Sequence, residues 1–238
     1  MRYLSVLAVL GMVGGCQDGA PTDSLQLDRA DSREVSGSYG DARFSARRTA
    51  DNVFEVRFDL GGGAFGTDVD WNTYVATTHV GDGWSMSAAD RARMGELARA
   101  IEDEVGNGDA VSDNLVRQAN LWSRHPEGAM VLPAEIVADR VRGWTSLCNG
   151  TSYRTFNWSW GSTAKSEYLK YGPGETSNPC RGRCGPGCTA AWGTSAWTVD
   201  CGRHDRCEQY GGSGVNSQCS DELASASDDF SFAGNCSY

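Results

Sequence analysis

Closely spaced cysteines near the C-terminus are the feature that most limits the fold of this chain. Seven of the nine cysteines lie between Cys180 and Cys236. Their spacings, C-x3-C-x3-C and C-x5-C, differ from the paired C-x2-C of a zinc ribbon. Clustered cysteines in an exported protein form disulfides that brace a small, loop-rich region. We therefore expect residues 144–238 to form a disulfide-stapled unit.

The beginning of the chain predicts export. Residues 1–15 place one arginine before an apolar run, residues 3–13, that is too short to span a bilayer. The ending V-G-G-C resembles a bacterial lipobox, which implies that Cys16 carries a lipid anchor and holds the protein at a membrane surface. By resemblance to known sorting rules, Gln17 favours the outer membrane. A cleaved signal with a stray cysteine is the alternative. We expect a lipid-anchored protein of the bacterial cell envelope.

Cysteine count and charge narrow the possibilities further. Without Cys16, eight cysteines remain, an even number that permits four disulfides. Eight cysteines allow about 105 pairings, so the count alone does not give the connectivity. A net charge of −10 argues against a nucleic-acid partner, and also against electrostatic docking on anionic lipid.

The sequence before the cysteine cluster predicts a region that serves as a structural scaffold. Residues 16–34 are polar and predict a tether behind the anchor. From Phe54 to Leu60, apolar and charged residues alternate, which predicts a half-buried strand of an antiparallel sheet. A glycine turn follows, and we expect the next strand near residues 71–80. Sheet and helices together should fill residues 35–143.

Helical periodicity appears after this sheet. Ser87 and Asp90 resemble a capping box, and apolar residues then recur at helical spacing until Gly106. A second helix is expected at about 112–122. The aromatic-rich segment 144–171 predicts strands of a small sheet, in which most of the aromatic residues form the core. The fold class is therefore α+β.

Two helices are expected within the cysteine-rich unit, at about 196–210 and 219–230. His204 lies on the first of them, with Asp205 projecting about 100° away. Counting from the helix ends, Asp221 and Glu222 of the second helix would face His204 if the two helices run antiparallel. A histidine oriented by a carboxylate is suited to act as a general base on water.

A glycine-rich segment before these helices adds a candidate cation site. Gly185 and Gly187 let the backbone turn its carbonyl groups inward, as a hard cation such as Ca2+ requires. Asp205 would add one carboxylate. Such an ion could polarise an ester carbonyl and stabilise an oxyanion.

Taken together, Cys-Gly-x-Gly followed by Asp-Cys-x-x-His-Asp-x-Cys resembles the secreted phospholipase A2 family. The resemblance begins at about Cys180 and implies two antiparallel, disulfide-linked helices, with His204 as the base that activates water. It further implies a Ca2+ site made by Asp205 with the carbonyl groups of three loop residues, and two disulfides. The loop residues are Arg183, Gly185 and Gly187, and the disulfides are Cys184–Cys201 and Cys207–Cys219.

The chain departs from the family pattern at the second helix. In the family, the carboxylate that orients the base directly follows the cysteine of this helix, whereas here Ser220 stands at that position. Asp221 comes one residue later, which turns its side chain by about 100° on a helix. Cys188 also replaces the second glycine of the family's loop.

Two functions follow from these observations. The first is calcium-dependent hydrolysis of glycerophospholipid esters, with His204 and Asp221 as the catalytic pair. The second is a non-catalytic, disulfide-rich envelope lipoprotein that acts as a structural or binding module. A serine hydrolase is disfavoured because the chain has no G-x-S-x-G motif. Zinc hydrolysis is disfavoured because His204 has no second histidine at ligand spacing.

Overall fold

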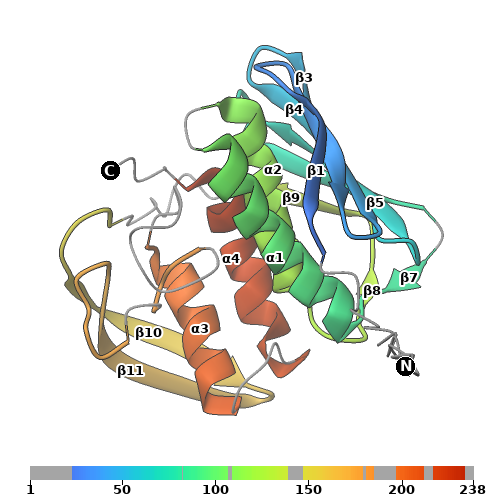
Figure 1. Ribbon diagram of the computed structural model, residues 1–238. Coiled ribbons are helices and arrows are strands. Elements are labelled where there is room, and N and C mark those ends of the chain that lie inside the picture. Colours follow the sequence, from blue (N-terminus) through green and yellow to red (C-terminus); the bar gives the residue numbers. More distant parts are fainter. Residues whose placement is uncertain are drawn as a thin grey trace, which may run out of the picture.

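The computed structural model is an α+β fold in which the two regions of the chain pack directly on each other. It describes residues 23–81, 83–106, 109–138, 147–178, 181–184, 197–211 and 217–233. Four layers follow one another in Figure 1: a large sheet, a first helix pair, a second helix pair and a β-hairpin. No helix among the described residues is long and apolar enough to cross a membrane. The expected signal peptide, Cys16 and the expected domain boundary at 143/144 lie outside the described residues.

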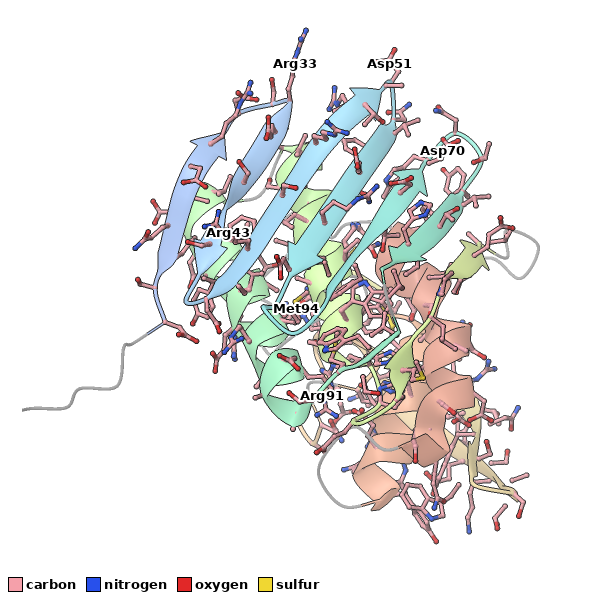
Figure 2. All side chains as sticks on the ribbon, turned by 90° about the vertical axis from the view of Figure 1, so that its right-hand side faces the viewer. Arg33, Arg43, Asp51, Asp70, Arg91 and Met94 are labelled. Atoms are coloured by element: carbon pink, nitrogen blue, oxygen red, sulfur yellow. A yellow bond between two sulfur atoms is a disulfide. The ribbon has the colours of Figure 1, made fainter. Side chains whose placement is uncertain are left out.

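The large sheet is antiparallel, with the strand order β1-β2-β3-β4-β5-β6-β9. The first six strands follow the chain as a meander, and short β9 pairs with β6 at one edge. Their bounds are β1 Leu25–Ala30, β2 Glu34–Tyr39, β3 Ala42–Ala50, β4 Val53–Asp59, β5 Ala64–Asp70, β6 Val75–Val80 and β9 Ala134–Val137. Figure 2 views the outer face of this sheet, where Arg43 and other polar side chains are exposed and the helices lie behind.

Strand β4 shows why the sheet has one dry face. Phe54, Val56 and Phe58 are at most 3% exposed, whereas the charged residues between them lie on the outer face. The expected alternation is therefore confirmed. Two helices cover the dry face, α1 (Ala88–Val105) and α2 (Ala110–Ser123). As expected, Ser87 and Asp90 form the capping box of α1, and Gly106 is its C-cap.

Two details of this region differ from the sequence-based expectations. Strand β1 lies within residues 16–34, which we expected to be a polar tether. Leu25 and Leu27 alternate with polar residues and pack against the core, so this stretch pairs with β2. In addition, β5 begins at Ala64 directly after the glycine turn and was not expected; its Phe65 and Val69 are buried in the core. The strand expected near residues 71–80 is β6.

The C-terminal region contains the β10–β11 hairpin and two helices. The bounds are β10 Ser152–Trp160, β11 Thr163–Tyr171, α3 Val199–Gly211, a 3-10 turn at Ser217–Cys219, and α4 Ser220–Phe232. Phe156, Trp158 and Tyr171 of the hairpin are buried against α3, whereas Tyr153 and Tyr168 stack on each other at the surface. The remaining short strands, β7 (Trp84–Ser85) and β8 (Met130–Val131), pair beside the large sheet.

Helix α4 joins the two regions. The Phe232 ring packs on Trp71 and Tyr74, with centroid distances of 5.3 and 5.6 Å. The Arg117 guanidinium of α2 donates to the Phe230 carbonyl at 3.4 Å, and the Gln118 amide donates to the Ser231 hydroxyl at 3.3 Å. The regions therefore share an interface with both apolar and polar contacts.

This interface yields a stability prediction. Phe232 is 1% exposed, so Phe232→Ala should leave a cavity and lower the free energy of unfolding by about 3–5 kcal/mol. Tyr168→Ala, at a ring that is 70% exposed, should cost about 1 kcal/mol or less. Urea denaturation of both variants measures the difference. Equal losses in the two variants would contradict the packing of α4 described above.

Candidate functional site

Disulfides fix the positions of the elements that carry the site residues. Cys207 of α3 is bonded to Cys219 at the start of α4, and their Cα atoms are 5.8 Å apart. A second disulfide, Cys184–Cys201, ties the segment before α3 to the first turn of that helix. Cys148 is also disulfide-bonded. The prediction of a disulfide-stapled region is therefore confirmed.

His204 lies in the interior of the protein. It is 1% exposed, and its buried Nε2 atom forms no hydrogen bond with any of the described residues. Burial lowers the pKa of His204 to about 3, and the nearby Arg124 guanidinium acts in the same direction. The imidazole is therefore neutral at physiological pH, which is the protonation state that a general base or a metal ligand needs.

The carboxylate that faces His204 is Glu208, one helical turn later on α3. Its Oε1 atom lies 3.4 Å from His204 Nε2, and its Oε2 atom accepts a hydrogen bond from Arg124 at 3.2 Å. Burial raises the pKa of Glu208, against the lowering effect of Arg124. The i,i+4 spacing of His204 and Glu208 was visible in the sequence and could have identified this pair.

Asp221 and Glu222, the two residues expected to face His204, bind the hairpin instead. The Ser159 hydroxyl of β10 lies within hydrogen-bond distance of both carboxylates, at 2.7 Å each, and the Ser159 N–H donates to Glu222 at 2.5 Å. Within the described residues, neither carboxylate forms a hydrogen bond or an ion pair with His204. The structure therefore does not bring Asp221 to the histidine, in keeping with its position one residue late on α4.

Asp205 lies beside the segment that leads into the glycine loop. Its Oδ2 atom accepts a hydrogen bond from the Gly182 N–H at 2.8 Å. Burial raises the pKa of Asp205 to about 7, although Arg124 and the Gly182 N–H favour the carboxylate form. Asp205 thus contacts the residue next to Arg183, the first of the expected loop ligands. Gly185 and Gly187 lie outside the described residues.

Arg183 itself is buried. It is 2% exposed, and its guanidinium lies over the Trp197 ring, 5.6 Å from the centroid. Its backbone pairs with that of Trp197, which fixes the chain directly before the Cys184–Cys201 disulfide. The Arg183 side chain is therefore part of the protein interior. The group of Arg183 that could hold an ion is its backbone carbonyl.

A cleft of about 940 Å³ opens between the two regions of the chain. Its walls come from α2, the β8–β9 segment, β10 and the two helices α3 and α4. On the β8–β9 side the rim is apolar, because Met130, Leu132 and Val137 line it and are 51–59% exposed. On the α3 side, its wall includes Asp200 and Arg203, and Arg203 directly precedes His204. The sequence had given no indication of this rim, since its three residues come from two short strands and the connection between them and follow no regular spacing.

Comparisons with protein-family models, with curated proteins and with solved structures found no match to this chain.

The neutral, buried imidazole predicts a specific pH dependence of stability. The pKa of His204 falls from 6.5 to about 3 on folding, so between these values the unfolded chain binds a proton that the folded protein does not. The stability contributed by the neutral ring is full above pH 6.5 and is lost as the pH falls toward 3. The wild type should therefore lose on the order of a few kcal/mol more than His204→Gln across this range.

Urea denaturation at several pH values measures this difference. His79→Gln is the matched control, because the side chain of His79 is 53% exposed on β6, and it should follow the wild type. Identical pH profiles for His204→Gln and the wild type would contradict a buried, neutral imidazole.

Proposed function

We propose that the protein hydrolyses glycerophospholipid esters at the bacterial cell envelope in a calcium-dependent reaction. The apolar-rimmed cleft carries this proposal, because its α3 wall reaches the residue before His204. An acyl chain could enter past Met130, Leu132 and Val137, while the ester approaches the polar end of the cleft. A lipid anchor at Cys16 would keep the protein at the outer membrane, close to such a substrate.

The residues near the cleft have chemistry suited to this reaction. His204 is the proposed base that takes a proton from the attacking water, and Glu208, rather than Asp221, is the carboxylate that positions its ring. The disulfide-linked pair of helices and the adjacent His204 and Asp205 support a phospholipase A2-like arrangement. The burial of His204 implies that the end of α2 near Arg124 must shift before water can reach the ring.

The residues present also fit a calcium ion. Asp205 offers a carboxylate next to the loop, and Arg183, Gly185 and Gly187 would offer carbonyl oxygens, which are the ligands that Ca2+ prefers. When bound, the ion would polarise the ester carbonyl and stabilise the negative charge that develops on it. In this proposal, Asp205 and the loop residues hold the calcium ion, and His204 takes the proton from the attacking water.

One observation favours a second function. With His204 only 1% exposed and Asp221 bound to Ser159, the same fold could serve as a non-catalytic, disulfide-rich lipoprotein. In that case the cleft would bind a ligand without turnover. The two functions make different predictions for hydrolysis.

Release of fatty acid from mixed phospholipid micelles tests the first function. Release should require Ca2+ and should fall by at least about 100-fold in His204→Gln, because a positioned general base contributes about that much. The control His79→Gln should keep wild-type activity. Absence of release from folded protein, over several head groups, would favour the binding module.

The apolar rim provides a second test of the same proposal. Leu132→Asp and Val137→Asp should each lower the rate on micelles by about tenfold, since burying an aliphatic side chain contributes about 1.5–3 kcal/mol. The rate on a monomeric, short-chain phospholipid should change little. Thr49→Asp, which adds the same charge at an exposed position of β3 outside the cleft lining, is the control. Unchanged micelle activity in both rim variants would show that lipid does not enter by this route.

A further inference from the structure

Three ligating side chains converge on one face of α3. His204, Asp205 and Glu208 each offer a nitrogen or oxygen atom, and these atoms all lie within 4.8 Å of one another. The sequence has no second histidine at ligand spacing from His204. In the structure, carboxylates occupy the positions that a second histidine would have filled.

The spacing between His204 and Glu208 fits two ligands of one ion. Nε2 and Oε1 are 3.4 Å apart and form no hydrogen bond, although both atoms are buried. Two ligands held at about 2.1 Å by a tetrahedral zinc ion lie about 3.4 Å from each other. Among the described residues, neither this nitrogen nor this oxygen has a hydrogen-bond partner, and the two are separated as two ligands of one ion would be.

Each of the two carboxylates, Asp205 and Glu208, accepts a hydrogen bond at one of its oxygens. Arg124 binds Oε2 of Glu208, and the Gly182 N–H binds Oδ2 of Asp205, so each group keeps one oxygen for an ion. Such outer contacts orient metal ligands and are a regular part of metal sites.

We propose that His204, Asp205 and Glu208 form a binding site for Zn2+. An imidazole nitrogen suits zinc and not calcium, which takes oxygen ligands. Three protein ligands leave a fourth position of the tetrahedron for water. This site uses Asp205, so zinc here and calcium at the glycine loop exclude each other. Zinc would also occupy the imidazole that the proposed hydrolysis needs, and would inhibit it.

Metal binding to the disulfide-intact protein, with free thiols blocked by alkylation, tests the site directly. We expect calorimetry to show one Zn2+ per chain, and Co2+ to give a visible ligand-field absorption band without thiolate charge transfer. His204→Gln and Glu208→Gln should each weaken Zn2+ binding by at least about 100-fold. Glu104→Gln, at an exposed position of α1, removes the same charge and should bind as the wild type does.

Further measurements distinguish zinc binding from the proposed calcium-dependent hydrolysis. Glu208→Gln should retain Ca2+ binding, because Glu208 is not among the proposed calcium ligands. Zn2+ binding that persists in both variants would assign the ion to another site, and absence of Zn2+ binding by the folded wild type would also overturn the proposal. Neither result bears on calcium-dependent hydrolysis, which is measured without zinc. If circular dichroism shows that His204→Gln is unfolded, Glu208→Gln decides the test.

Discussion

The packing of α4 between α2 and α3 is the constraint on which the rest of the structure depends. On one side, the Cys207–Cys219 disulfide fixes α4 against α3. On the other, Phe232 and the polar contacts of Arg117 and Gln118 fix α4 against α2 and the large sheet. Because one short helix satisfies both partners, the sheet region and the cysteine-rich region cannot move independently. The cleft, which both regions line, exists only as a result of this packing.

The same packing accounts for the unusual electrostatics of the site. Arg124, at the end of α2, reaches Glu208 across the interface and helps to keep His204 neutral. Burial raises the pKa of both Asp205 and Glu208, against the lowering effect of Arg124 on each of them. Burying such groups costs free energy unless they are paired or bind an ion. This cost is the physical reason for expecting that the cluster has a function, whether in proton transfer or in metal binding.

The two proposals place different demands on His204. Hydrolysis requires that water reach the ring, and hence that the interface near Arg124 open. Zinc binding requires only that the present arrangement persist, because the ligand atoms already face one another. The cleft is compatible with both the hydrolytic and the non-catalytic function, because a lipid bound there could be hydrolysed or could remain intact.

Local sequence determined the helices, several strands and the presence of disulfides. Alternation in β4, the capping box at Ser87 and the spacing of the cysteines report on neighbouring residues, and these expectations agree with the structure. Tertiary structure alone decided the partner of Asp221, whereas the i,i+4 spacing of His204 and Glu208 on α3 is a local feature of the sequence. On an α-helix one residue of offset rotates a side chain by about 100°, and the register between α4 and β10 brings Asp221 to Ser159. The register arises from long-range packing that no local pattern encodes, and the same holds for Arg124 and for the cleft.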